Sequence, residues 1–300
     1  MITLRQIQFA LAVSRHKHFK RAAEECEVSQ SALSLGIAEM EKNLGVVIFE
    51  RNNKHVVVTP IGEELLARAQ KIYLDAQQLM ERAHAGQGNL RFGMSIGFIP
   101  TISPYLLPSA LPLIREQYPD FQLNVREDLS ERLLLAVQSG LLDAAVVALP
   151  IDVMGLDCMI FGEERFYAVV HHQHAFANQE EVKLHQLRND NLLLLGEGHC
   201  LKEQIVELCR LQDNLHKDQF RDASLSTLIH MVQNNMGMTL APEMALPTLQ
   251  AYSHIRTIPL ESKGSHRRLA IVTRPNYPRT EELKLLVKLF QSALQQLYSS

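Results

Sequence analysis

Two cysteines, Cys200 and Cys209, lie nine residues apart in the stretch GEGHCLKEQIVELCR of a chain that contains four cysteines. A thiol in the first turn of a helix meets unpaired backbone N–H groups and the positive end of the helix dipole, and both favour the thiolate. His199, next to Cys200, can donate a hydrogen bond or add positive charge. A thiolate attacks peroxide to give a sulfenic acid, which condenses with a second thiol. These residue types are therefore candidates for redox chemistry.

The surrounding residues predict a strand, NLLLL, then a loop, GEGH, then one amphipathic helix over 200–210 with Ile205 and Leu208 on its core face. Nine helical residues advance about 13.5 Å, whereas a disulfide needs Cα atoms within about 7 Å of each other. The two thiols can therefore bond only after the helix unfolds locally. The spacing leaves two interpretations open: a switch that a disulfide traps in an open state, or two unrelated core cysteines.

The composition is that of a soluble globular protein of two or three domains, with 300 residues, 46% of them hydrophobic and 21% charged. No apolar run approaches the roughly 18 residues of a membrane helix, and the N-terminus lacks the pattern of a signal peptide. We therefore expect a cytoplasmic protein with no membrane partner, in which any disulfide is transient. The net charge of −3 means that a nucleic-acid surface must be a local patch.

Residues 1–60 predict helices over 3–15, over 19–26 and from Ser29, then the strands VVIFE and HVVVT around an RNNK turn. This order is typical of a winged helix–turn–helix, in which the second helix of the motif enters the major groove of DNA. A small helical packing domain with a solvated polar face would show a similar pattern. If the unit binds DNA, polar residues of the third helix meet base edges and basic residues of the hairpin reach phosphate. The predicted DNA-binding residues are Gln30, Ser31, Ser34, Arg51 and Lys54.

Residues 61–88 predict a linker helix and a hinge. Thr59-Pro60 is a typical helix start, and the GQG at 86–88 is a flexible break. The spacing between apolar residues alternates between four and three, which indicates the seam of a coiled coil and hence a homodimer. A helix that packs on its own domain is the alternative. The seam residues are Leu65, Ala69, Ile72, Ala76, Leu79 and Ala83.

Strand and helix patterns alternate over 89–300, which predicts an α/β fold with a mostly parallel sheet covered on both faces. A second set of elements and the return of RRLAIVTRP and the last helix predict two lobes. Lobe I takes about 89–163 and 269–300, and lobe II takes about 164–268. Ligands of such folds bind beyond the carboxyl ends of the strands, here in the cleft between the lobes.

The string FKRAAEECEVSQSALSLGIAEMEKNLGVVIFERNNKHVVVTPIGEELL resembles the N-terminal domain of LysR-type transcriptional regulators. The matching elements are the AA pair, SQ-x-x-LS-x-x-I-x-x-x-E-x-x-LG and FER…TPIG. Ser31 stands where the family usually has Pro, and 35–38 lacks its frequent Gln and Arg, which bears on sequence preference rather than on DNA binding. The resemblance implies a two-lobed regulatory domain like that of periplasmic binding proteins. It also implies a pseudo-palindromic operator in double-stranded DNA, a homodimer that associates into a homotetramer, and contact with RNA polymerase.

The regulatory part resembles the hydrogen-peroxide-sensing members of that family through GHCL-x-x-Q…C, GFIPT-x-x-PYLLP and FRDASLSTLIHMV with GMTLAP. This resemblance implies that Cys200 reacts with hydrogen peroxide, that Cys209 resolves the product as a disulfide, and that the change redirects binding at antioxidant promoters. The protein would then be an activator rather than an enzyme, and would need no cofactor. The implied peroxide pocket comprises Thr101, Ser130, which stands where the family usually has a second threonine, His199 and Arg274.

Three alternatives remain open. The chain could be a LysR-type regulator of a small metabolite with incidental cysteines, or a thiol peroxidase, which the absence of CxxC and the DNA-binding pattern disfavour. A metal or haem site made of His199, Cys200 and Cys209 needs a broken helix. The histidines of HHQHAF (171–176) form a weak metal pattern for which a solvated turn is the better interpretation, so no metal site is predicted. Cys26 and Cys158 are interpreted as structural.

Overall fold

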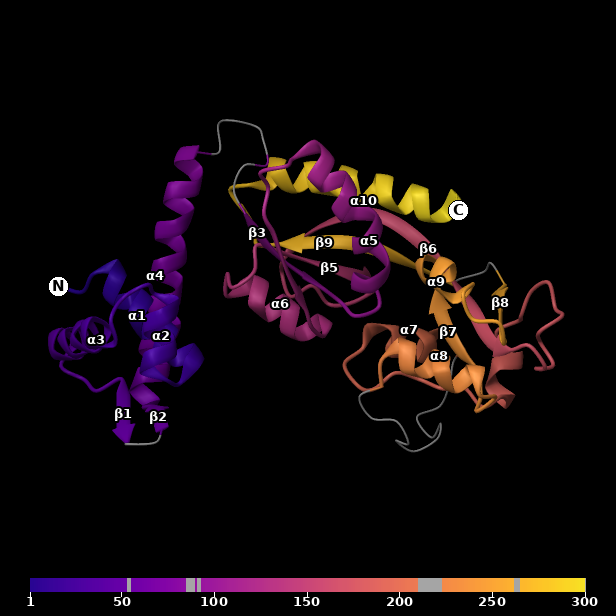
Figure 1. Ribbon diagram of the computed structural model, residues 1–300, viewed down its shortest axis with the longest axis horizontal. Coiled ribbons are helices and arrows are strands. Elements are labelled where there is room, and N and C mark those ends of the chain that lie inside the picture. The colour runs from indigo at the N-terminus through magenta and orange to yellow at the C-terminus, as the bar shows by residue number, and fades with distance from the viewer. Residues whose placement is uncertain (53–54, 85–89, 91–92, 210–222, 262–264, 300) are drawn as a thin grey trace. The chain divides into compact units, whose positions relative to one another are not determined.

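A computed structural model describes residues 1–52, 55–84, 90, 93–209, 223–261 and 265–299. The chain divides into two compact units, Met1–Gln87 and Gly88–Ser300. No helix among these residues is long and apolar enough to cross a membrane. The predicted α/β fold with an N-terminal helix–turn–helix is confirmed (Figure 1).

The N-terminal unit contains the three predicted helices and the predicted hairpin (Figure 1). Ser29 caps the third helix by accepting the N–H of Ala32, and Gly45 ends it with a φ of 71°, a conformation that glycine adopts without strain. Gly36 costs helix propensity, but a Cβ there would lie 2.9 Å from the ring of Phe9, so the close approach of the two helices requires glycine. The elements are α1 (Leu4–His16), α2 (Phe19–Glu25), α3 (Gln30–Leu44), β1 (Phe49–Asn52), β2 (His55–Val58) and α4 (Pro60–His84).

The linker helix α4 has one buried and one exposed apolar side. Leu66 and Ala69 belong to the core of the N-terminal unit, which α1 also lines. Ile72 and Leu79 of the predicted seam are 49% and 72% exposed. The helix therefore both packs on its own unit and presents unburied apolar residues. The predicted break at 86–88 and the side chain of Ala83 lie outside the described residues.

The C-terminal unit is built on a mixed seven-stranded sheet in the order β4-β3-β5-β9-β6-β7, with β8 also paired to β6. Among the strand pairs that the structure describes, only β3–β4 and β3–β5 are parallel, so the expectation of a mostly parallel sheet is wrong. The reason is that β6 and β9 run antiparallel to their neighbours as they pass between the two ends of the unit. The strands are β3 (Met94–Phe98), β4 (Leu123–Glu127), β5 (Ala144–Leu149), β6 (Asp157–His171), β7 (Thr239–Pro242), β8 (Ile255–Pro259) and β9 (His266–Thr273).

Two hydrophobic cores lie in this unit. The first core comprises buried residues from 90–161 and 269–294, together with Cys200 and Met244. Figure 1 shows α5 (Ser103–Gln117) and α10 (Thr280–Ser299) on one face of its sheet and α6 (Ser130–Gln138) on the other. The second core comprises buried residues from 166–260, including those of α8 (Leu225–Gln233) and, apart from Cys200, the buried apolar residues of α7 (Cys200–Cys209). The remaining short helices are η2 (Gln186–Asn189), η3 (Glu243–Ala245) and α9 (Leu246–Leu249).

The stretch NLLLL before the loop is not a strand, contrary to the prediction. A single parallel bridge joins Leu192 to Met238, and no ladder extends from it. Met238 follows a turn in which Asn235 and Gly237 have positive φ, and the residues after it form β7, whose ladder pairs with β6. The helix predicted from Cys200 is confirmed as α7.

Candidate redox site

A small pocket lies at the start of α7; it is partly open to solvent and in this structure leaves no room for a water-sized sphere. It is therefore far smaller than the roughly 300–1,000 Å³ of a typical small-molecule site. Gly198, with a φ of 83°, shapes its wall, because a Cβ there would lie 2.9 Å from Leu129. Three of the four predicted pocket residues come together with Cys200 in this lining, which consists of Ile99, Pro100, Thr101, Leu129, Ser130, Gly198, His199 and Cys200.

Cys200 is the first residue of α7 and is only 4% exposed. Burial raises the pKa of its thiol, while the Arg267 guanidinium and the nearby Ser130 hydroxyl act against the rise. A helix start favours the thiolate, but in this buried position desolvation of the charged form acts in the opposite direction.

Arg267, rather than Arg274, is the cation of this site. Its Nη1 and Nη2 donate to Oγ1 and O of Thr101 at 3.0 Å each, and its Nε donates to Glu164 at 2.8 Å. Burial raises the pKa of Glu164, and the guanidinium opposes that rise. Arg274 instead donates to the carbonyls of Val137 and Leu142 at 2.8 and 2.6 Å. The two arginines are seven positions apart along β9 and the residue that follows it, roughly 23 Å, so the prediction of Arg274 in the pocket is wrong.

The two hydroxyls of the pocket differ in their partners. Thr101 Oγ1 accepts from Arg267, which leaves its own O–H proton to be donated elsewhere. Ser130 Oγ is buried, and among the described residues it has no hydrogen-bond partner of ordinary geometry. A buried hydroxyl without a partner is costly unless a ligand or water satisfies it. The pocket therefore offers two hydroxyl groups beside the Cys200 sulfur. That of Thr101 can donate a hydrogen bond, and that of Ser130 can donate or accept one.

Cys209 ends α7 and is fully buried in the second core. It does not line the pocket and is not disulfide-bonded to Cys200. Because α7 is intact between the two residues, nine helical steps hold them about 13.5 Å apart. Gln204, between them, donates from Nε2 to the carbonyl of Ala148 in β5 at 3.3 Å. The sequence had offered no role for this buried amide or for Glu164.

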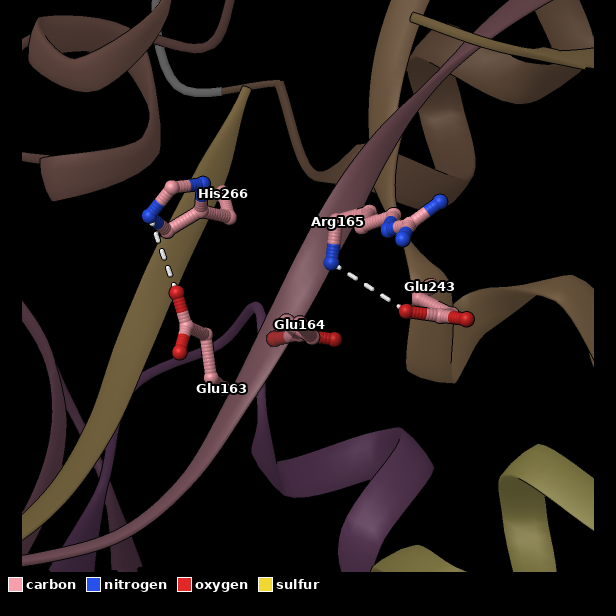
Figure 2. Close-up of a pocket in the computed structure, with 5 residues that line it drawn as sticks. All are labelled: Glu163, Glu164, Arg165, Glu243 and His266. Carbon is pink, nitrogen blue, oxygen red and sulfur yellow. Dashed lines mark hydrogen bonds and ion pairs between the residues drawn. The ribbon is translucent and has the colours of Figure 1, made fainter. Parts of the chain in front are cut away.

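A second pocket lies where β6 passes from one core to the other, and its lining is entirely polar (Figure 2). His266 Nε2 lies 2.9 Å from Glu163 Oε1, and the backbone N–H of Arg165 donates to Glu243 at 3.2 Å. Glu164 lies between these two interactions. Pockets for organic metabolites are mostly apolar, so this pocket does not have the lining expected of a metabolite cleft.

The candidate DNA-binding residues lie at the start of α3. Gln30 and Ser31 are exposed, and Ser34 is half-buried. Ser31 Oγ lies 3.0 Å from Ser29 Oγ at the helix cap. These positions leave the first turn of α3 accessible, as a recognition helix needs. The side chain of Arg51 and all of Lys54 lie outside the described residues.

Comparisons with known proteins agree with this architecture. The family described as "Bacterial regulatory helix-turn-helix protein, lysR family" matches residues 4–63, and "LysR substrate binding domain" matches residues 88–295. The chain is 34% identical over 291 residues to the HTH-type transcriptional regulator EstR of Acinetobacter baylyi, covering 96% of each. It is 34% identical over 279 residues to a hydrogen peroxide-inducible genes activator of Haemophilus influenzae, covering 92% of each. A solved full-length OxyR variant from Pseudomonas aeruginosa has a TM-score of 0.80 at 32% identity, over 97% of this chain and 95% of that chain.

The chain therefore belongs to the LysR-type family of helix–turn–helix transcriptional regulators. Within that family it is an OxyR-like regulator, similar to hydrogen peroxide-inducible activators over most of its length. The relatives compared are regulators of transcription rather than enzymes.

Proposed function

We propose that this regulator senses hydrogen peroxide directly through Cys200 and Cys209. The observation that carries the proposal is the pocket at Cys200, which is too small for an ordinary metabolite and has an unsatisfied hydroxyl, Ser130 Oγ, beside the sulfur. Thr101 and Ser130 hold the two oxygens of the peroxide, and the Arg267 charge stabilises the developing thiolate and the departing oxygen. His199 lines the same pocket and is proposed to help orient the ligand.

The reaction has two balanced steps. The Cys200 sulfur attacks one peroxide oxygen, the O–O bond breaks, and the thiol proton ends on the departing oxygen to give water and a sulfenic acid. The Cys209 sulfur then attacks the sulfenic sulfur, the S–O bond breaks, and a second water leaves as the S–S bond forms. Two thiols are oxidised to one disulfide and one peroxide is reduced to two waters. The protein's own residues suffice, so no cofactor takes part.

The second step requires a change of structure. The thiols stand at opposite ends of an intact α7, so the disulfide forms only when that helix opens and at least one thiol leaves its core. The disulfide then holds the C-terminal unit in a second state, in which the opened α7 no longer joins the two cores as it does in the reduced protein. This change of state alters how the DNA-binding units of an oligomer engage the promoters of antioxidant genes.

The oligomer and its partners are part of the proposal. The exposed seam residues Ile72 and Leu79 of α4 support pairing of two chains through this helix. A dimer would place two α3 helices on the half-sites of a pseudo-palindromic operator, with Gln30, Ser31 and Ser34 at base edges and Arg51 and Lys54 at the backbone. We further propose that two dimers form a tetramer on DNA and that the activated form recruits RNA polymerase.

The test is a non-reducing peptide map of the reduced full chain after one equivalent of hydrogen peroxide. The expected product is a Cys200–Cys209 disulfide, absent in Cys200→Ser. In Cys209→Ser a sulfenic acid at Cys200 should accumulate instead, and a carbon nucleophile should trap it. Operator footprints of the reduced and oxidised protein should differ.

Cys158→Ser is the matched control, because Cys158 is the exposed thiol. If exposure governed reactivity, Cys158 would react first, whereas the proposal expects this variant to behave as the wild type. Free thiols at both Cys200 and Cys209 with the peroxide unconsumed would reject the proposal. A metabolite-responsive regulator, with incidental cysteines, would then be the function to test.

A further inference from the structure

Three histidines gather at the far end of β6, in a part of the chain that the proposed peroxide chemistry does not use. His171 ends β6, His172 follows it, and His254 directly precedes β8. One ligand nitrogen of each lies within 4.8 Å of the others. The ring centroids are 4.2 Å apart for His171 and His172 and 5.1 Å apart for His172 and His254.

The strand register explains why residues so distant in sequence meet. The antiparallel ladder of β6 and β8 pairs His171 with Ile255, and its next step places His172 opposite His254. The backbone N–H of His172 donates to the carbonyl of His254 at 2.8 Å, which holds that pair in place. Side chains at opposed positions of an antiparallel pair are close neighbours. Figure 1 shows β8 beside this end of β6.

The electronic and solvent environment suits a metal ion. Imidazole nitrogen is a preferred ligand of zinc, nickel, cobalt and copper. His172 Nδ1 is buried and has no hydrogen-bond partner among the described residues, so it is a lone buried nitrogen that needs one. His254 is exposed, so the cluster opens to solvent on one side.

We propose that His171, His172 and His254 bind one divalent transition-metal ion, with Zn²⁺, Ni²⁺ and Co²⁺ as the fitting class. Nitrogens bound tetrahedrally to Zn²⁺ lie about 3.4 Å from one another, so small ring rotations from the present spacing complete the set. The exposed side leaves a coordination position for water. Along β6 the site lies roughly 23 Å from Glu164, the ion-pair partner of Arg267, so it is distinct from the redox pocket.

The histidines that form this site differ from those that the sequence suggested. The motif HHQHAF suggested His174 as the third ligand, and on that basis no metal site was predicted. In the structure His174 Nε2 lies 3.3 Å from Asp190 Oδ1 instead. The third histidine of the cluster is His254, which lies 82 positions after His172 in the chain.

Metal binding has one structural consequence in the turn after β6. His171 Nδ1 accepts the backbone N–H of Gln173 at 3.3 Å. A neutral imidazole that gives one nitrogen to a metal carries its proton on the other, so this hydrogen bond and the metal exclude each other whichever nitrogen binds. This hydrogen bond is long, so its loss opposes metal binding only weakly. The ion should therefore rearrange the turn while tying β6 to β8.

The test is calorimetric titration of the reduced, metal-free full chain with Ni²⁺, together with the absorption spectrum of its Co²⁺ complex. We expect one equivalent to bind, with no thiolate-to-cobalt charge-transfer band. His254→Gln and His172→Gln should each lower the affinity at least tenfold. His174→Gln is the matched control, since it changes a histidine of the same turn, and it should bind as the wild type does. Ni²⁺ should also raise the thermal unfolding midpoint of the wild type but not of His254→Gln.

Several outcomes would overturn the site. They are the absence of stoichiometric binding, an affinity unchanged in His254→Gln, an equal loss in His174→Gln, or a thiolate band showing that cysteines hold the ion. Because His254 is exposed, its substitution should leave the metal-free melting curve unchanged, which separates loss of a ligand from loss of the fold. Peroxide-driven formation of the Cys200–Cys209 disulfide should proceed in all three variants, so this proposal and the proposed function fail independently.

Discussion

The two ends of α7 lie in different environments, although ten residues make up the whole helix. Cys200, at its start, belongs to the first core and faces a pocket with polar groups. Cys209, at its end, belongs to the second core among apolar neighbours. Gln204, between them, reaches back to β5 of the first core. One helix therefore joins the two cores, and each thiol is fixed in a different one.

This difference separates the two steps of the proposed chemistry. The Cys200 end faces a small pocket with polar groups, and the proposed first step takes place there while the protein stays folded. The Cys209 end has no access to that pocket until α7 opens. The first step should then depend on the pocket residues, and the second on the stability of α7 in the second core. A substitution at one end of α7 should therefore leave the step at the other end unchanged.

The largest effect is expected from Arg267→Met at the Cys200 end. This change leaves Glu164 buried without its cation, which should lower the free energy of unfolding by about 3–5 kcal/mol. It also removes the charge that opposes the raised pKa of the Cys200 thiol, so sulfenic acid formation should slow. Urea denaturation and stopped-flow peroxide kinetics measure the two effects.

Arg274→Met is the matched control for the kinetic effect. Its guanidinium bonds to the carbonyls of Val137 and Leu142 and is absent from the pocket. The rate with peroxide should therefore equal that of the wild type. If the reaction with peroxide slowed in Arg274→Met but stayed normal in Arg267→Met, Arg274 would be the cation of the pocket, as the sequence suggested.

A smaller effect is expected from Ile205→Val at the other side of α7. Ile205 is 1% exposed in the second core, and losing one methylene there costs about 0.5–1.5 kcal/mol. Because the loss falls on the closed helix, α7 should open more often, and disulfide formation after the sulfenic acid should speed up roughly 2- to 10-fold. Quenched-flow thiol blocking measures this step separately from the first.

Ile37→Val makes the same change in the core of the N-terminal unit, where Ile37 is fully buried. It should destabilise that unit and leave the disulfide step unchanged. Equal acceleration in both variants would mean that global rather than local unfolding governs the reaction.

Local patterns in the sequence predicted the elements that hold the site. The helix start at Ser29, apolar periodicity in α7 and the clustering of Thr101, Ser130, His199 and Cys200 all appear in the structure. These features depend on neighbours in sequence or on motifs of the family.

What the sequence did not predict depends on register and burial. RRLAIVTRP contains arginines at its start and at its end, and only the hydrogen bonds of the folded protein tell that Arg267, rather than Arg274, reaches Thr101. His254 meets His172 only through the β6–β8 register. The pKa of Cys200 follows from desolvation, which a position at a helix start does not reveal.

The pH dependence of stability sharpens the comparison at the Cys200 end. The thiol has a raised pKa in the folded protein, against an ordinary value near 9.0. The unfolded chain therefore loses this proton first as the pH rises, so the stabilising contribution is complete below about pH 9 and declines through the folded-state pKa. Cys200→Ser has no such thiol, so its stability should not decline for this reason. The measurement compares the unfolding free energies of the reduced wild type and reduced Cys200→Ser at increasing alkaline pH. A difference between them that stays constant with pH would contradict a buried neutral thiol.

The smallest effect on stability is expected from Ser130→Ala. Ser130 Oγ is buried with no partner of ordinary geometry, so its removal leaves no other group unsatisfied and should change the unfolding free energy by less than about 0.5 kcal/mol. Its effect should appear in the chemistry instead, because one hydrogen bond to the bound peroxide is lost. That loss corresponds to a rate roughly 2- to 10-fold lower in the first step.

Ser130→Thr keeps the hydroxyl and should hold the rate near that of the wild type, which separates hydrogen bonding from packing. The disulfide step, governed by the far end of α7, should be unchanged in both variants. A slowed second step would show that the two ends are not independent. An unchanged first step in Ser130→Ala would mean that this hydroxyl does not contact the oxidant, and Thr101 with Arg267 would then hold it alone.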